Sequence, residues 1–549
     1  MPAVKDMVPD IAPLRPPEEV MRLSRFGAMM PTRLSFLRAV VRRLCAERSK
    51  ITRTVWTMDA LGHGTAVYSV DFGGHTYSLV ALSHDLPEDQ RSDRVIATAW
   101  DAVFVLYDGV PSSSEVARIA RNAPLQEAGR FSPRDLVLSR ANKSVRMWDA
   151  TARALQAGTQ PDAAMIRDIG YLMRTTAVYG NGKFGIADRY LIADRKGLGG
   201  PFAAEMLTVY LIRHFTLDLV QHVGQGRLDP QLARHLGIGN ATGLGMAPFL
   251  VNHPVLLNNW MMARETALAR VRQIETLSED QQAHLKALAK RAAQHLSEWH
   301  VPASDHDEAL RRLEREWTGF AHHFDALDAP RPMDALWAVA QNASVALQEL
   351  LLSLILEPFG DLIDGLADCM GDPFGPLTSP FGGTQALRHA IETNWPWVFG
   401  IDYTDAEACR RFWYVSAAKL EPRLGDRYLD VGAELETPLD IGRRVKALYE
   451  NLPTTDAPVS AFLEAHPGHA LAISRVALTA RYPYADIRDN LIASTCRPID
   501  MLRCKLSFFG ATKFDPKSDL WTRITLAQGA PLGDELMPEN DDWWMPVLT

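Results

Sequence analysis

The chain has 549 residues, of which 47% are hydrophobic and 23% are charged, which is the composition of a globular protein with a large core. Its formal net charge of -8 argues against a general affinity for nucleic acid or for an anionic membrane. The amino terminus lacks the basic and apolar regions of a secretory signal, and every apolar run is shorter than a membrane span, so we expect a cytoplasmic protein. Five scattered cysteines without a C-x-x-C motif argue against a disulfide framework or a zinc finger.

Residues 1–50 are predicted to form a proline-rich arm followed by two basic helices, which Pro31 separates. The arginines of these helices are Arg22, Arg25, Arg33, Arg38, Arg42, Arg43 and Arg48. Three roles are open for this basic surface: a solvated face, a contact in a homodimer, or a set of partners for acidic side chains elsewhere in the chain.

Residues 51–110 show a different pattern, rich in Val, Thr, Tyr and Trp, which favours β-strands. The strands are expected at 51–59, 65–72, 75–83 and 94–107. Gly73-Gly74 lies between two of them and has the chemistry of a two-residue hairpin turn. We therefore predict a small antiparallel meander.

Residues 111–390 have mainly helical periodicity and are predicted to form a helical core region. Helix starts are indicated by capping residues, often followed by proline, at Ser132, Asp229 and Ser278. Helix ends are predicted at Gly158, Gly224 and Gly237. The charged amphipathic helices within 255–327 are expected to form an outer layer.

The most unusual stretch runs from Pro332 to Leu387, which contains seven carboxylates and no Lys, Arg or His. Within it, Ala335–Cys369 is apolar almost all round at the helical period, so we predict one buried helix that Pro358 bends. At about 100° per residue its polar side chains form one stripe. The carboxylates of this acidic stripe are Glu349, Glu357, Asp361, Asp364 and Asp368.

Buried carboxylates must be paired, bound to a metal or protonated, because an isolated buried charge is too costly. Arginines from neighbouring helices would make the acidic stripe a structural ion-pair network. Alternatively, the stripe holds a divalent cation or a cationic substrate, or it simply faces solvent. For the functional alternative, we assign Glu357 and Asp361 to catalysis because they flank the bend, and Glu349, Asp364 and Asp368 to a metal.

A second candidate site lies on the predicted helix Pro201–Val223, where His214, Asp218 and His222 are spaced by four and share one face. Histidines at this spacing can bind one metal ion, and the acid between them could be a third ligand. The alternative is a set of ordinary, partly exposed residues near the helix end. Arg213 lies off this face and is a candidate partner for the acidic stripe.

A third candidate is the glycine-rich segment Tyr179–Gly185, whose backbone amides could point at an anion. Asn181 and Lys183 lie within it, and Arg174 and Arg189 flank it. The segment is not a P-loop, because no Ser or Thr follows the lysine in the required setting. For a substrate-anion site, we assign Lys183 to catalysis and Arg174, Asn181 and Arg189 to substrate binding. An ordinary turn between helices is the alternative.

A fourth candidate is Gly237–Met246, where the spacing G-x-G-x-x-x-G-x-G follows a predicted helix rather than a strand. It therefore does not match a dinucleotide-binding fingerprint. Its glycines imply a close approach of the backbone to a packed neighbouring helix or to a ligand. For the second alternative, Gly239, Asn240 and Thr242 are assigned to substrate binding.

Residues 391–549 are predicted to form a mixed α/β region. Strands are expected at 395–401 and 520–527, and helices at 439–451 and 457–464. Trp543 and Trp544 near the carboxyl terminus should dock against the rest of the chain. The basic surroundings of Cys496 and Cys504 leave open either a structural or a reactive thiol.

The expected fold is α+β and predominantly helical, with domains at 1–50, 51–110, 111–390 and 391–549. The function we expect is a cytosolic enzyme, a lyase or hydrolase, that acts on a small anionic metabolite with a divalent metal such as Mg, Mn or Fe. No nucleotide-cofactor motif, H-E-x-x-H or G-x-S-x-G is present. The alternative is a non-catalytic helical scaffold or regulatory protein in which the buried ion pairs are structural.

Overall fold

The computed structural model describes most of the chain. The described residues are 14–20, 22, 25, 30–87, 100–123, 132–179, 192, 194–242, 254–370, 381–405, 438–481, 509–518 and 521–548.

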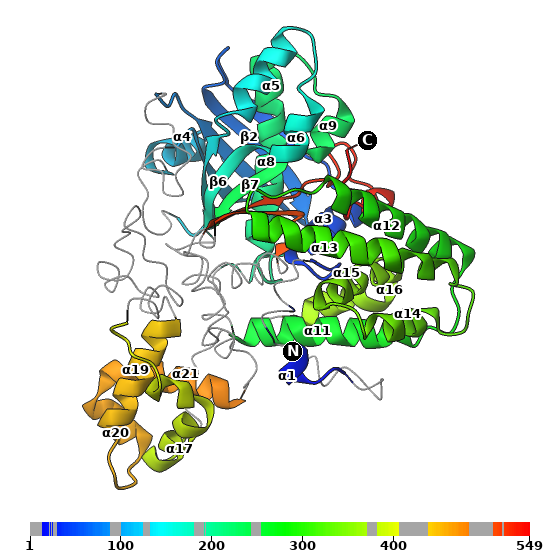
Figure 1. The fold of residues 1–549 in the computed structure, drawn as a ribbon. Helices are drawn as coiled ribbons and strands as arrows, with labels where there is room; N and C mark the ends of the chain where they lie inside the picture. Colours follow the sequence, from blue (N-terminus) through cyan, green and yellow to red (C-terminus); the bar gives the residue numbers. More distant parts are fainter. Residues whose placement is uncertain are drawn as a thin grey trace.

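A nine-stranded sheet forms the centre of the described structure, with the strand order β1-β2-β3-β4-β5-β6-β7-β9-β8. Its strands are β1 (Thr52–Trp56), β2 (Gly64–Phe72), β3 (His75–Ser83), β4 (Ala102–Asp108), β5 (Asp135–Lys143), β6 (Tyr171–Tyr179), β7 (Gly237–Thr242), β8 (Lys513–Ser518) and β9 (Trp521–Leu526). Neighbouring strands are antiparallel, except that β6 and β7 are parallel. Figure 1 shows the carboxyl-terminal strands completing a sheet that begins near the amino terminus.

The predicted meander is present as β1–β4, and its hairpin turn is confirmed. Gly73 and Gly74 have φ values of +64° and +72°, which glycine adopts without strain, and β2 pairs with β3 directly on either side of them. The prediction of a small sheet was only partly right, because five further strands extend it. Three of these strands, β5, β6 and β7, lie within 111–390, which was expected to be helical.

Ser132 shows why one of these strands was missed. Its hydroxyl accepts a hydrogen bond from the Arg134 amide at 3.1 Å, and its carbonyl accepts one from the Asp135 amide at 3.0 Å. These bonds close a tight turn, and β5 begins at Asp135. A Ser-Pro pair can start either a turn or a helix, so the predicted helix start was wrong.

One face of the sheet is covered by the buried helix α8 (Ala203–Gly224), which contacts β2 through β7 (Figure 1). α3 (Phe36–Ala46) and α5 (Met147–Gln156) pack against α8. On the other face, α4 (Ser113–Asn122) adds Ile119 to a separate apolar cluster of β2–β4 side chains. None of the described helices combines the length and the apolar composition needed to cross a membrane.

A second group of helices packs beside the sheet (Figure 1). It comprises α11 (Pro254–Arg272), α12 (Glu279–Glu298), α13 (Ser304–Phe320), η5 (Ala321–Asp325), α14 (Pro332–Ala340), α15 (Val345–Ile355), η6 (Glu357–Phe359), α16 (Gly360–Ile363) and η7 (Asp364–Met370). The predicted capping box at Ser278 is present at the start of α12. The outer helices expected within 255–327 are also present.

The predicted burial holds for α15 and for Glu357 and Phe359 of η6, whereas Val339 and Leu362 are 44% and 39% exposed, and the stretch Ala335–Cys369 is not one bent helix. α14 ends at Ala340, and Ser344 caps a new helix by accepting a hydrogen bond from the Leu347 amide. Pro358 then falls in a 3₁₀ turn rather than inside a continuous α-helix, as expected for a residue that cannot donate to the helical ladder.

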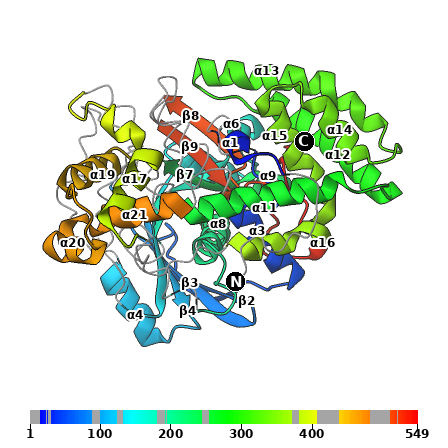
Figure 2. The ribbon, with the colours of Figure 1, turned by 90° about the horizontal axis from the view of Figure 1, so that it is seen from below.

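The helices α17 (Thr384–Asn394), α19 (Pro438–Asn451), α20 (Val459–Ala465) and α21 (Ala470–Arg481) share a hydrophobic core of their own. Figures 1 and 2 both show them grouped on one side of the structure. α19 and α20 match the predicted helices at 439–451 and 457–464. Residues 395–401 do not form the predicted strand, because Pro396–Phe399 is a 3₁₀ turn, η8.

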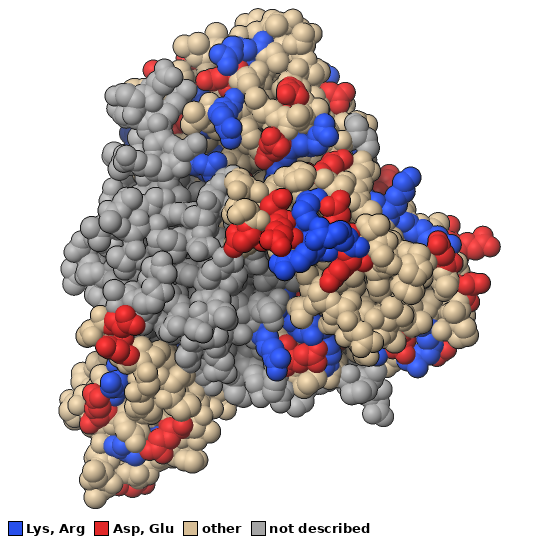
Figure 3. All heavy atoms as spheres, in the orientation of Figure 1, with Lys and Arg blue, Asp and Glu red and all other residues tan. Residues whose placement is uncertain are grey.

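The remaining short helices are α1 (Pro17–Val20), α6 (Ala163–Ile169), α9 (Pro230–His235), η9 (Pro467–His469) and η10 (Pro538–Asn540). The strand predicted at 520–527 is β9. Trp543 and Trp544 are both buried, so the expected docking of the carboxyl-terminal tail is confirmed. Acidic and basic side chains are interspersed over the described surface that Figure 3 shows.

Leu352 on α15 is fully buried in the main hydrophobic core. We expect Leu352→Ala to lower the free energy of unfolding by about 2–5 kcal/mol, because it removes buried methyl groups and leaves a cavity. Leu362→Ala is a matched control, because Leu362 is 39% exposed and should lose less than about 1 kcal/mol. Chemical denaturation measures both values, and equal losses would contradict the burial of α15.

Candidate functional site

The acidic stripe is met by arginines from the amino-terminal segment. Arg38 of α3 donates to both carboxylate oxygens of Glu357, at 2.5 and 2.9 Å, in a bidentate pair with both side chains buried. Arg33 and Arg42 bind Asp364, with the closest contacts at 2.7 and 3.1 Å. Arg33 also donates to the Glu357 carbonyl at 3.3 Å.

Glu349 lies among three arginines from different parts of the chain. Arg264 of α11 contacts one carboxylate oxygen at 2.5 Å, while Arg25 and Arg15 lie 3.2 and 3.8 Å from the other. Burial alone would raise the pKa of Glu349, but Arg264, Arg15 and Arg25 hold it below its usual value. The carboxylate is therefore ionised and fully neutralised by protein charges.

The acidic stripe is thus an ion-pair network at Glu349, Glu357 and Asp364, which is the first of the three alternatives that the sequence left open. Asp361 is exposed, so it does not share a buried site with Glu357. The side chain of Asp368 lies outside the described residues. A catalytic role for Glu357 and Asp361 stays a prediction.

His214, Asp218 and His222 face β1 and β2, and each contacts a residue of that part of the chain. The His214 ring packs edge-on against Tyr68 at 5.2 Å, and burial lowers its pKa. Asp218 accepts a hydrogen bond from the Tyr68 hydroxyl at 2.8 Å, and His222 Nε2 donates to the Asp59 carbonyl at 2.7 Å. Among the described residues, no group of three His, Cys, Asp or Glu is placed to hold a metal ion.

Arg213 is not a partner of the acidic stripe. Its guanidinium is buried in α8 and donates to backbone carbonyls, including those of Leu236 at 2.7 Å and of Ala530 and Pro531 at 2.9 Å. Burial lowers the pKa of Arg213 to about 10. It therefore ties the end of α9 to the segment that follows β9.

The glycine-rich segment from Gly237 follows helix α9, as expected, but it begins with strand β7 rather than with a loop. Gly239 is the neighbour of Arg174 across the parallel ladder, and a Cβ at Gly239 would lie 2.6 Å from the Tyr171 ring. Glycine is needed there because an aromatic ring covers the strand.

Asn240 lies next to Thr175 and donates to its hydroxyl at 3.0 Å. The structure therefore brings the predicted binding residues Arg174, Gly239 and Asn240 together on β6 and β7. Thr242 belongs to the same strand, and its side chain lies outside the described residues. Asn181, Lys183 and Arg189 also lie outside them, so an anion site at Lys183 stays a prediction.

A groove of about 510 Å³ between α6, the start of α5, the α12–α13 connection and strands β8 and β9 is a candidate binding site. Its charged and polar lining residues include Arg146, Asp162, Asp168, His300, Asp515 and Arg523. Tyr171, which covers Gly239, lines the same groove. No sequence motif pointed to it, because its residues come from five separate segments.

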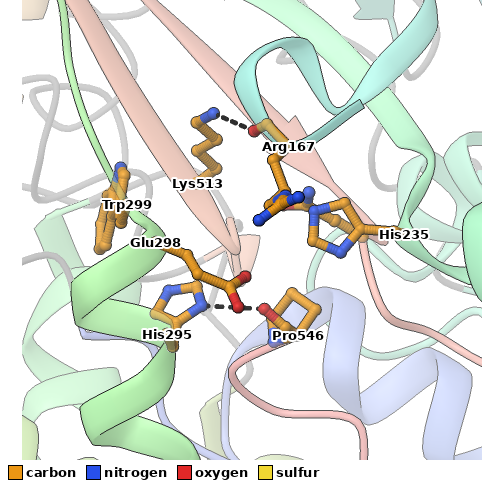
Figure 4. Close-up of a pocket in the computed structure, with 8 residues that line it drawn as sticks. Arg167, His235, His295, Glu298, Trp299, Lys513 and Pro546 are labelled. Atoms are coloured by element: carbon orange, nitrogen blue, oxygen red, sulfur yellow. Dashed lines mark hydrogen bonds between the residues drawn. The ribbon is translucent and has the colours of Figure 1, made fainter. Parts of the chain in front are cut away.

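A smaller cavity of about 20 Å³, lined mainly by buried side chains, lies beside α6, α9, α12 and β8 (Figure 4). Its lining residues include Arg167, His235, His295, Glu298 and Lys513. Lys513 Nζ donates to the carbonyls of Arg167 and Asp168 at 2.7 and 2.6 Å. His295 Nδ1 donates to the Pro546 carbonyl at 3.0 Å, which fixes the proton of the neutral ring on Nδ1.

The two histidines of this cavity are neutral at physiological pH. Burial lowers the pKa of His235 to about 3, helped by His295, Lys513 and Arg167. Burial also lowers the pKa of His295 to about 4, although its bond to Pro546 opposes this. Both pKa values lie below the ordinary histidine value.

Comparison of the chain with protein-family models, curated proteins and solved structures found no match. Function therefore has to be inferred from the chemistry of the groove and the cavity. α6 contributes to both, because Arg167 lines the cavity and Asp168 lines the groove.

We expect Arg38→Met to lower the free energy of unfolding by about 3–5 kcal/mol, because it leaves the Glu357 carboxylate buried without its bidentate partner. Arg43→Met on the same helix is the control. Arg43 pairs with Glu47 in a half-exposed i,i+4 bridge, so the loss should be below about 1 kcal/mol. Denaturant titration compares them, and a loss for Arg38→Met as small as that of the control would refute a structural role for the pair.

The neutral histidines predict a loss of stability in acid. Because their folded pKa values are depressed, the unfolded state binds more protons once the pH falls below about 6.5. Stability should therefore decrease from pH 6.5 towards pH 4, by about 2 kcal/mol for each histidine at pH 4.5. His235→Asn with His295→Asn should flatten this decline, whereas His300→Asn at an exposed position should leave it unchanged. If the stability of the double variant still falls as steeply between pH 6.5 and pH 4, His235 and His295 are not the cause of the acid sensitivity.

Proposed function

We propose that the chain is an enzyme of the lyase or hydrolase class that acts on a small anionic metabolite bound in the groove. The observation that carries this proposal is the groove itself. Its volume of about 510 Å³ falls within the range of about 300–1,000 Å³ typical of small-molecule sites. Its lining combines two guanidinium groups, three carboxylates and one imidazole.

Arg146 and Arg523 supply the charge that an anionic metabolite needs, since a guanidinium can bind a carboxylate or phosphate through two parallel hydrogen bonds. Arg146 is exposed at the start of α5, so it can reach a ligand without losing a buried partner. Asp168 is also exposed and lies on α6, opposite the connection that carries His300. These two groups are the candidates for proton transfer, because both are common general acids and bases.

The donor set of the described residues does not favour a metal at the acidic stripe. The oxygens of Glu349 and Glu357 are occupied by arginines, and Asp162 at the groove already accepts a hydrogen bond from the Ala164 amide at 2.9 Å. We therefore derive no catalytic step through a divalent ion. A cytoplasmic location and a homodimer remain parts of the proposal.

Anion binding in the groove can be measured by thermal unfolding with succinate and with inorganic phosphate. A ligand at about 100 times its dissociation constant stabilises the folded state by about 2.7 kcal/mol. We expect at least one of the two anions to raise the melting temperature, with putrescine as a cationic comparison that should have no such effect.

Arg146→Ala should abolish this stabilisation, while Arg153→Ala should preserve it, because Arg153 is an exposed arginine at the opposite end of the same short helix and does not line the groove. The two variants remove the same charge from α5. Equal responses to the anions in both variants would contradict binding at Arg146.

A second candidate function is a non-catalytic scaffold or regulatory protein, and the ion-pair network favours it. The arginines at positions 15, 25, 33, 38 and 42 all reach carboxylates that lie far away in the sequence. Charges used in this way are structural and need no substrate. Loss of anion binding in Arg146→Ala supports the enzyme proposal, whereas the absence of any anion effect in the native chain supports the scaffold.

A further inference from the structure

We propose that the cavity between α6, α9, α12 and β8 is a binding site for one small inorganic anion of the halide class. This site is separate from the groove and does not depend on the proposed enzymatic activity. Three features of the cavity favour such an occupant: its size, the sign of the charges around it, and a buried ring nitrogen that has no partner among the described residues.

The cavity is built for an occupant of atomic size. Its volume of about 20 Å³ exceeds the space of about 10–15 Å³ that one water molecule requires. A monoatomic anion fits this space, whereas a carboxylate or phosphate group would extend beyond it. The cavity walls are formed largely by buried side chains, among them His235, His295 and Lys513.

The charges around the cavity are predominantly positive. Arg167 extends from α6 towards His235, and Lys513 approaches from β8 (Figure 4). The charges of both residues act on the His235 ring and contribute to its lowered pKa. Lys513 already donates to two carbonyls, so it contributes charge at the cavity rather than a required hydrogen bond.

The carboxylate that lines the cavity is that of Glu298, and its oxygens are already engaged. One accepts from Gln294 Nε2 at 3.1 Å and the other from the Leu548 amide at 3.4 Å. The Glu298 carboxylate therefore links α12 to the carboxyl-terminal tail through hydrogen bonds. Its charge offsets part of the positive potential but leaves the side of the cavity near Arg167 and His235 cationic.

His235 supplies the polar group that requires an occupant. Its Nδ1 is buried and has no hydrogen-bond partner among the described residues, although a buried polar atom without a partner is costly. An anion accepts a hydrogen bond from this ring when Nδ1 carries the proton. The Arg167 guanidinium donates through Nε to the Ala163 carbonyl at 3.5 Å, and it extends towards His235 (Figure 4), so its Nη atoms are candidates to donate to the same occupant.

Binding of the anion should be coupled to proton uptake. The titratable groups that face the histidines are Arg167 of α6, Lys513 of β8, and Arg291 and Glu298 of α12. An anion among them screens the cationic groups and favours the protonated ring of His235 or His295. The affinity should therefore be higher at pH 5.5 than at pH 8.

The occupant can be identified with bromide, which scatters anomalously in X-ray diffraction. Crystals of the full chain soaked in sodium bromide should show an anomalous peak inside the cavity. In solution, sodium bromide should raise the melting temperature above its value in equimolar sodium methanesulfonate, whose anion is too large for the cavity. This difference should be larger at pH 5.5 than at pH 8.

Arg167→Met should remove the difference between the two salts, because it deletes the half-buried guanidinium and keeps most of the side-chain volume. Arg312→Met is the matched control, since Arg312 is an exposed arginine on α13 away from the cavity, and its response to bromide should equal that of the native chain. Density for a water molecule without an anomalous signal overturns the proposal. So does a bromide response that Arg167→Met retains in full.

Discussion

The bidentate pair between Arg38 and Glu357 is the interaction that joins the main parts of the structure. Arg38 lies on α3, which packs against the central helix α8, and Glu357 lies in the 3₁₀ turn after α15. The guanidinium also lies 5.2 and 5.6 Å from the rings of Trp543 and Trp544. One buried cation thus connects the sheet layer, the second group of helices and the carboxyl-terminal tail. A buried guanidinium is stable only when an opposite charge lies beside it. The packing of these three parts around Arg38 is therefore interdependent.

The fold could be predicted where local chemistry alone decides the conformation. Gly73-Gly74 closes a hairpin because both positions need a positive φ, and Ser278 starts α12 because its capping box satisfies free amides. The prediction of secondary structure was wrong where contacts between residues far apart in the sequence decide the conformation. Strand β5 follows a Ser-Pro turn, and the same two residues can equally well start a helix. Only the pairing of this segment with β4 and β6 selects a strand. The break before α15 is likewise set by Ser344 within an apolar stretch whose period alone suggested one helix.

The candidate sites were less predictable than the fold, because their residues come from many segments. The sequence showed that Pro332–Leu387 has no cation of its own, and it offered the basic helices of residues 18–50 as one source of partners. It could not select pairing over metal binding, since both need buried carboxylates in the same stripe. The glycines of Gly237–Met246 left open a close approach by a packed neighbour or by a ligand, and at Gly239 the Tyr171 ring makes a close approach. The groove and the cavity carry no motif at all.

Helix α6 links the two sites through its carboxyl-terminal end. The Lys513 ammonium binds the Arg167 and Asp168 carbonyls there, where a positive charge is favourable because the last helical carbonyls lack amide partners. This attachment to β8 places the Arg167 side chain at the cavity and Asp168 at the groove. Any occupant that holds Arg167 therefore also restrains the helix that presents Asp168. The strand that anchors α6 comes from near the carboxyl terminus, so both sites can form only after the last strands have joined the sheet.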